Sequence, residues 1–151
     1  MIAARSILLA ILLCAPAVGL PQSLEQVPAA ATAVGAEIPA EPSLDDLRWV
    51  ARPLVVFADT PEDPRFIQQM RMLDADPDPL LERNVVILSD ADPATNSPLR
   101  QRLRPRDFGL VLIDVDGSVA QRRPVPTSVR ELVNLIDRMP SRREETGSRR
   151  P

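Results

Sequence analysis

Two continuous apolar runs separated by an amphipathic segment dominate the first half of the pattern of hydrophobic and polar positions. Residues 53–58 and 84–88 read PLVVFA and NVVIL, which have the length and character of strands buried on both faces. Between them, Asp63 and Pro64 supply a helix N-cap and a proline at the first helical position, and apolar residues follow at helical spacing as far as Leu73. The pattern therefore predicts a βαβ unit, whose crossover is right-handed in nearly all cases.

The second half of the pattern predicts a hairpin and a closing helix. A short helical turn is expected over residues 98–103, then an apolar strand over 108–113 and a returning strand over 118–123, with the hairpin turn at Asp116-Gly117. A capping box of Ser128 and Glu131 and one apolar face mark the last helix, which ends at Pro140. Together these elements predict an α/β fold with a central mixed sheet of about four strands and flanking helices.

Residues 1–17 have the order of a secretory signal peptide. Arg5 precedes an apolar run and Ala15-Pro16-Ala17 follows it, so we expect cleavage after Ala17 or at a bond close by. The apolar run is too short for a membrane-spanning helix. A lipid anchor on Cys14 is the alternative, although Leu13 stands where such a motif needs Gly, Ala or Ser. We therefore expect a secreted or periplasmic protein whose mature chain has no transmembrane segment.

The rest of the chain divides into a leader, one domain and a tail. Residues 18–42 are rich in Ala and Pro and lack apolar periodicity, so we interpret them as a flexible leader. The domain is expected over residues 43–140, where Ser43 caps a short helix and Trp49 is a packing anchor. Residues 141–151 are charged and carry no large apolar side chain, which predicts a disordered tail.

Composition narrows the possible chemistry. All eighteen basic residues are Arg, twenty-one residues are acidic, and the formal net charge is −3. A nucleic-acid-binding domain needs a basic excess and usually stacking aromatic rings, and this chain has neither feature. The chain has no histidine and no lysine, and Cys14 is its only cysteine, so a mature chain without Cys14 has no thiol chemistry. We expect no cofactor and no metal.

Three stretches of the sequence are similar to stretches found in a known family. They are Arg48-Trp49 with the run 52–58, the stretch 108–117, and the stretch 135–143. They resemble a family of bacterial secreted domains of unknown function, related to a domain in vertebrate extracellular proteins of the sushi-repeat-containing and coiled-coil-domain-containing kinds. The resemblance covers about residues 44–144 and implies a thioredoxin-like fold without supplying an activity. Relatives carry Gly-Lys where this chain has Asp114-Val115.

The resemblance also bears on redox chemistry. Thioredoxin-like enzymes place their reactive cysteine where the first strand meets the first helix, and here that stretch, residues 58–62, has no cysteine. Redox relatives hold a cis-proline immediately before the third strand, and here Arg106-Asp107 fills that place. We therefore expect a binding or interaction domain rather than an oxidoreductase.

Asp114 and Asp116 carry the enzymatic alternative. An apolar strand running into Asp-x-Asp-Gly resembles the first motif of haloacid-dehalogenase-type phosphatases, in which the first Asp is the nucleophile and the second the acid or base. Two carboxylates at this spacing are able to face one Mg²⁺. The family's lysine is absent, so a simple hairpin turn competes with this metal-dependent hydrolase as the interpretation.

The expected interaction surface lies where the first strand ends and the first helix begins. Asp59, Thr60 and Glu62 are there, and we expect them to face Arg106 and Asp107 across the loop before the third strand. Two prolines remove backbone donors and the acids repel anions, so simple phosphate is not expected to bind. A polar ligand, or an envelope or extracellular protein that offers hydrogen-bond donors, fits better. Helix capping by these acids is the alternative.

Export with cleavage predicts a specific mass for the mature protein. Intact-mass analysis of the exported chain is expected to show the loss of about 17 to 20 residues. A mature chain that retains Met1 would contradict the assignment of a cleaved signal peptide.

Overall fold

A computed structural model describes residues 43–148, and the expected signal peptide and leader lie outside these residues. Strand β1 (Arg52–Phe57) is central and runs parallel to β2 (Val85–Asp90). Strand β3 (Gly109–Ile113) pairs antiparallel with β1 on its other side and with β4 (Val119–Arg123), which gives the order β2-β1-β3-β4. The mixed four-stranded sheet expected from the sequence is confirmed.

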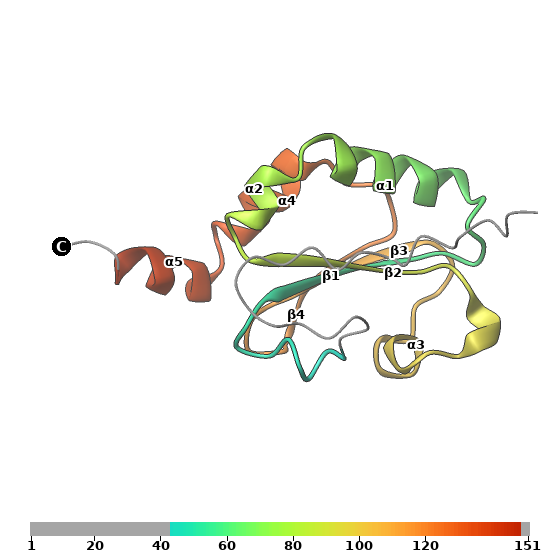
Figure 1. Ribbon diagram of the computed structural model, residues 1–151, viewed down its shortest axis with the longest axis horizontal. Helices are drawn as coiled ribbons and strands as arrows, with labels where there is room; N and C mark the ends of the chain where they lie inside the picture. The colour runs from blue at the N-terminus through green and yellow to red at the C-terminus, as the bar shows by residue number, and fades with distance from the viewer. Residues whose placement is uncertain (1–42, 149–151) are drawn as a thin grey trace, which may run out of the picture.

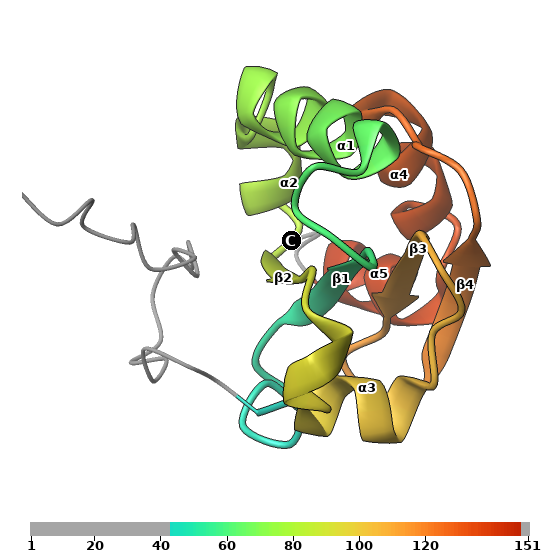
Figure 2. The same cartoon turned by 90° about the vertical axis from the view of Figure 1, so that its right-hand side faces the viewer.

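Helices cover both faces of this sheet, as Figures 1 and 2 show. Helices α1, α2 and α4 lie on one face, and α3 lies on the other together with residues 43–51. No helix within residues 43–148 combines the length and the apolar character needed to cross a membrane. The bounds of the helices are α1 Pro64–Ala75, α2 Asp78–Leu81, the short 3-10 helix η1 Pro93–Thr95, α3 Pro98–Leu103, α4 Val129–Ile136 and α5 Pro140–Gly147.

The apolar core has two halves because the side chains of β1 alternate between the two faces of the sheet. Leu54 and Val56 pack into the cluster beneath α1, α2 and α4, and Val55 and Phe57 pack into the cluster on the α3 side. All six residues of β1 are buried. The continuous apolar run predicted a strand buried on both faces, and β1 is that strand.

Helix α1 is tied to the rest of its layer by a buried amide. The Gln69 side chain is fully buried, donates from Nε2 to the carbonyl oxygen of Thr127 at 3.1 Å and accepts from the Thr127 backbone N–H at 2.7 Å. Since an unpaired buried amide is costly, this reciprocal pair fixes the rotation of α1 about its axis.

The segment before β1 differs from the expectation. Ser43 and Asp46 exchange hydrogen bonds as a capping box does, but residues 44–50 form turns rather than a helix. Trp49 has a left-handed φ of 65° and donates its backbone N–H to the carbonyl oxygen of Val115 at 2.6 Å. Its side chain is consequently 70 % exposed, and Leu47 is the buried anchor instead. The assignment of Trp49 as a packing anchor was wrong.

The C-terminal segment also differs. Pro140 does not end the ordered domain but occupies the first position of α5, where a proline is well tolerated. Figure 1 shows α5 at the end of the sheet where β1 begins. The fully buried Arg52 holds it there, because its guanidinium lies 2.6 Å from Oε1 of Glu145 and donates to Oγ of Ser141 at 3.1 Å. The expected disordered tail was therefore wrong for the part that the structure describes, since an ion pair across the chain orders it.

This contact has a pH dependence of known sign. Burial alone would raise the pKa of the Glu145 carboxyl, but hydrogen bonds from Arg52 and Arg142 outweigh that effect and lower the pKa below its ordinary value of 4.5. A carboxyl whose pKa is lower in the folded than in the unfolded state stabilises the fold fully when the pH is above the pKa that the group has in the unfolded chain. The stabilisation is lost as the pH falls through the lowered value.

Glu145→Gln is expected to lower the free energy of unfolding by about 1 to 2 kcal/mol at neutral pH, because Arg52 loses one charged partner. Glu144→Gln, at a solvent-exposed position on the same helix, is the matched control. It is expected to change the free energy of unfolding by less than about 0.5 kcal/mol. Urea denaturation followed by far-UV circular dichroism measures both. The difference between wild type and Glu145→Gln is expected to disappear well below pH 4.5, and equal stabilities at neutral pH would contradict the role of the pair.

Candidate functional site

The loop that leaves β1 is held in place from the α3 side. The backbone N–H of Ala58 donates to the carbonyl oxygen of Asp90 at 3.0 Å, so β1 and β2 end together. Arg100 donates to the carbonyl oxygens of Ala58 and Asp90, pairs with the Asp90 carboxylate at 2.8 Å and lies 5.5 Å from the centre of the Phe57 ring. The start of the next loop is therefore rigidly placed.

Thr60 organises that loop through both its side chain and its backbone. Its hydroxyl oxygen accepts from the Glu62 backbone N–H at 3.0 Å, and the hydroxyl donates to the Glu62 carboxylate. Its carbonyl oxygen accepts from the backbone N–H of Asp63 at 3.2 Å. Asp63 then caps α1, as the sequence predicted, by accepting from the Arg65 backbone N–H at 2.8 Å.

Arg65 clamps this loop to the segment before β3. Its guanidinium donates to both carboxylate oxygens of Asp63 at 3.1 and 2.8 Å, and to both of Asp107 at 3.2 and 2.7 Å. The guanidinium also lies 5.4 Å from the centre of the Phe108 ring. Two carboxylates from distant parts of the chain thus share one arginine, and planar bidentate pairing fixes their orientation.

These contacts keep the carboxylates ionised. Hydrogen bonds from Arg65 lower the pKa of Asp63 and of Asp107, and the Thr60 hydroxyl lowers the pKa of Glu62. The two carboxylates in turn raise the pKa of the Arg65 guanidinium. The charges of these four groups are consequently constant over the physiological pH range.

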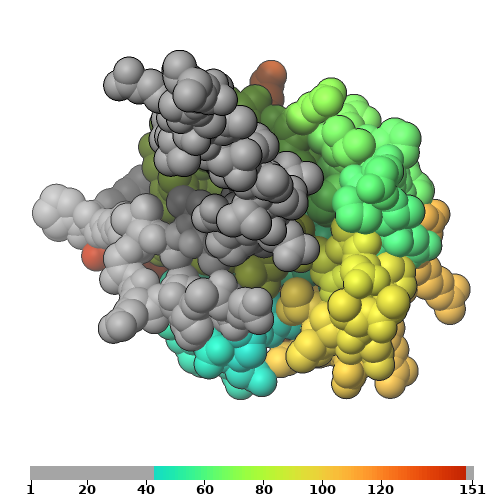
Figure 3. All heavy atoms as spheres, turned by 45° about the vertical axis from the view of Figure 1, so that its right-hand side comes forward, coloured from blue at the N-terminus to red at the C-terminus, as the bar shows by residue number. Residues whose placement is uncertain are grey.

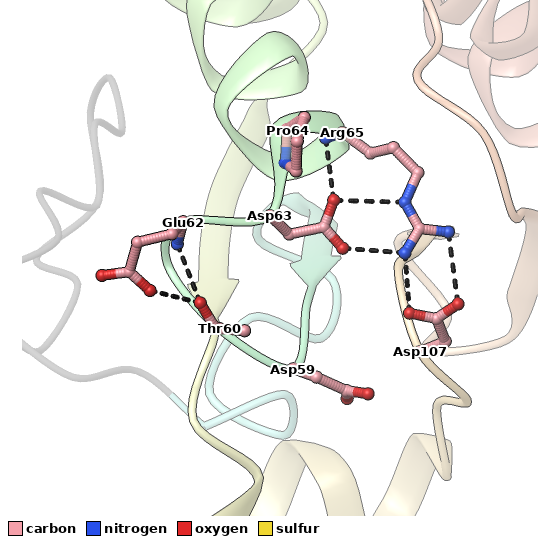
Figure 4. Close-up of a pocket in the computed structure, with 7 residues that line it drawn as sticks. All are labelled: Asp59, Thr60, Glu62, Asp63, Pro64, Arg65 and Asp107. Carbon is pink, nitrogen blue, oxygen red and sulfur yellow. Dashed lines mark hydrogen bonds and ion pairs between the residues drawn. The ribbon is translucent and has the colours of Figure 1, made fainter.

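The loop and the clamp border a shallow, open pocket of about 490 Å³. Figure 4 shows its lining, and in Figure 3 the start of α1 and the region of η1 and α3 form adjoining parts of the surface. Among the described residues no group of acidic side chains is arranged to hold a metal ion. The lining residues are Asp59, Thr60, Glu62, Asp63, Pro64, Arg65 and Asp107.

The structure brings together most of the residues that the sequence singled out. Asp59, Thr60 and Asp107 line one pocket, as expected. Arg106 does not line it and is exposed to solvent, and Arg65 supplies the positive charge in its place. Asp107 has a left-handed φ of 55°, so the chain turns sharply between Arg106 and β3 and presents only the Asp107 carboxylate to the clamp.

Arg65 was missed because its role depends on a partner 42 positions along the chain. A local signal existed, since an arginine two residues after a helix N-cap is able to reach the capping carboxylate. The same pattern is common on helix surfaces and does not indicate a site by itself.

The Asp114 and Asp116 carboxylates do not converge on a cleft. Asp114 lies 3.3 Å from the Arg52 guanidinium and accepts from the Ser141 hydroxyl at 2.7 Å. Asp116 is exposed and accepts from the Ser118 backbone N–H at 2.8 Å within the hairpin turn, where Gly117 has a φ of 85°. The structure gives the hydrolase alternative no support.

Solved structures with this fold include peroxiredoxins of malaria parasites. The reduced Plasmodium vivax 2-Cys peroxiredoxin is 20 % identical with a TM-score of 0.52, covering 62 % of this chain and 80 % of its own. A Plasmodium yoelii protein described as Prx1a, modified at its N-terminus, is 22 % identical with a TM-score of 0.52, covering 72 % and 83 %. At this identity the similarity shows a thioredoxin-like fold and nothing about activity.

A search of curated proteins found no match. A family model described as a domain of unknown function, DUF4174, matches residues 43–145. This range begins at the first described residue and reaches the Glu145 that pairs with Arg52, so it includes the sheet, the pocket and most of α5. The chain therefore belongs to the DUF4174 family.

Proposed function

We propose that this chain is an exported binding domain without redox chemistry, and that the pocket at the start of α1 receives a cationic, hydrogen-bond-donating group of an envelope or extracellular partner. The observation that carries the proposal is the state of the polar groups in the pocket. The backbone N–H groups of Glu62, Asp63 and Arg65 already donate within the protein. The Asp59 carboxylate, in contrast, is exposed and makes no hydrogen bond or ion pair within residues 43–148. The signal-peptide pattern and the resemblance to a domain of vertebrate extracellular proteins support the location.

The backbone N–H groups at the start of α1 are not available to an anionic ligand. Positions 61 and 64 are prolines without an N–H, and the N–H groups of Glu62, Asp63 and Arg65 already donate to oxygens of Thr60 and Asp63. A helix N-terminus binds anions through free N–H groups, and these five positions offer none. The start of α1 therefore lacks the free N–H groups through which other helix N-termini bind a phosphate or carboxylate.

The charges of the lining favour a cation. Four carboxylates face a single guanidinium in the lining, and Asp63 and Asp107 already occupy that guanidinium on both sides. Asp59 and Glu62 are left as exposed carboxylates beside the pocket. An arginine, a lysine or an amine of a partner would complete their hydrogen bonding.

Thiol chemistry is not available at this position. Residues 43–148 contain no cysteine, so no thiolate nucleophile stands at the start of α1. The carboxylates of Asp63, Asp107 and Glu62 are held ionised by Arg65 and by the Thr60 hydroxyl, which equips them to accept hydrogen bonds. These features support binding as the function of the pocket.

Site-specific photo-crosslinking tests the location of the site. A benzoylphenylalanine introduced at Pro61, which is exposed beside the pocket, is expected to crosslink a partner in the producing cell. The same probe at Arg130, exposed on α4, is the positional control. Asp59→Asn combined with Thr60→Ala is expected to reduce the Pro61 crosslink about tenfold, and Glu144→Gln is expected to leave it unchanged. Identical products from both positions, or none from Pro61, would contradict the proposal.

The pH dependence of binding follows from the lowered pKa of Glu62, which meets the cation, and from the lowered pKa values of Asp63 and Asp107, which hold Arg65 in place. These groups stay charged down to below their ordinary values, and the chain has no histidine, so affinity for a cation is expected to be constant between about pH 5 and 8. It is expected to fall below about pH 4, as the carboxylates protonate. Amide chemical-shift changes at Asp59 and Thr60 on titration with N-acetyl-arginine amide measure this. A transition between pH 5 and 8 would refute it.

A further inference from the structure

The outward face of α1 carries an apolar hollow that the fold does not use. The hollow has a volume of about 490 Å³ and follows one side of the helix for its whole length. Its lining residues recur at the three- and four-residue spacing that places side chains on one helix face. They are Pro64, Ile67, Gln68, Arg71, Met72 and Ala75.

The inner side of α1 packs apolar residues against the core, but it also buries one polar side chain. The inner side buries the polar Gln69 completely, with both ends of its amide paired to Thr127. The outer side leaves Ile67 37 % exposed, next to the half-buried Met72. A surface helix normally presents polar residues outward, so Ile67 and Met72 give this hollow apolar area that a partner would bury.

The hollow continues into the acidic pocket. Pro64 lines both, so the two depressions adjoin at the start of α1. Together with the helix, whose twelve residues span about 18 Å, they make one extended surface. We call this combined surface the α1 groove.

Carboxylates stand at both ends of the α1 groove. Asp59 and Glu62 are exposed at the end where α1 begins. Where α1 ends, the exposed acids are Asp74, Asp76 and Asp78. Arg71 is the one basic side chain among the residues that line the apolar hollow. The middle of the groove is therefore mostly apolar with one arginine, and each end carries exposed carboxylates.

We infer that the α1 groove binds a segment of a partner protein that has an apolar middle and a Lys or Arg near each end. Apolar burial over Ile67 and Met72 would supply affinity, and the acidic ends would set the register of the segment. This inference rests on the proposed function, since the cation that enters the pocket becomes one end of the segment.

Charge complementarity argues against a second copy of the chain, and against the chain's own residues 18–42, as what binds in the α1 groove. Two α1 grooves from two copies of the chain would place carboxylates against carboxylates in either relative direction, which is repulsive. Residues 18–42 of the chain itself contain three Glu and no Lys or Arg, so that segment lacks the required charges. A basic, amphipathic segment of another protein matches the groove.

Selection from a phage-displayed library of random peptides of about 16 residues, long enough to span α1, tests the inference with the exported full chain. Enriched peptides are expected to share an apolar centre with basic residues on both sides. For the most enriched peptide, Ile67→Ser is expected to weaken binding about tenfold and Asp74→Asn about threefold. Val125→Ser, at an exposed apolar residue outside α1, is the matched control and is expected to leave affinity unchanged.

Three results would overturn the inference: no enrichment, enriched peptides without paired basic ends, or affinity that is insensitive to Ile67→Ser. Self-association that increases with concentration and is lost in Ile67→Ser would also overturn it, in favour of a second copy as the occupant. Crosslinking from Pro61 without any selected peptide would overturn this inference and leave the proposed function standing. Peptide binding that is weakened by Ile67→Ser but unchanged by Asp59→Asn combined with Thr60→Ala would instead refute the proposal that the acidic pocket is the binding site.

Discussion

Burial of β1 on both faces is the constraint on which the rest of this structure depends. Each side chain of the strand must enter one of two apolar clusters, so helices have to cover the sheet from both sides. The two ends of the strand then carry the polar features. Arg52 begins β1 and is buried with it, which requires the carboxylates of Asp114 and Glu145. At the other end the chain emerges at Asp59, beside Arg100 and the clamp made by Arg65.

Elements defined by contacts within a few residues could be predicted from the sequence. The apolar run that became β1, the Asp63 cap of α1 and the Ser128 cap of α4 all depend on near neighbours, and the structure has each of them. The order of elements was sufficient for the mixed sheet, because crossover handedness and hairpin geometry leave few arrangements open.

Features that depend on distant partners could not be predicted in the same way. Nothing around Arg52 indicates that it meets Glu145, 93 positions away, so α5 was expected to be disordered. Asp107 lines the pocket, whereas Arg106, which we expected to face the same loop, is exposed and does not line it. The true partner, Arg65, is brought there by the packing of α1 against the sheet. The left-handed backbone of Trp49 likewise reflects a hydrogen bond to Val115 in the hairpin.

The orientation of Trp49 decides what the protein's intrinsic fluorescence reports. Trp49 is the only tryptophan, the chain has no tyrosine, and the indole is largely in water with the Arg48 guanidinium 5.8 Å from its centre. Unfolding scarcely changes the surroundings of a ring that is already hydrated, so the emission maximum is a poor indicator of folding in this domain. Trp49 belongs to the segment that packs on the face of the sheet opposite α1, and its backbone N–H bonds to Val115 at the hairpin. Its emission would therefore respond to a partner that binds on that side of the molecule.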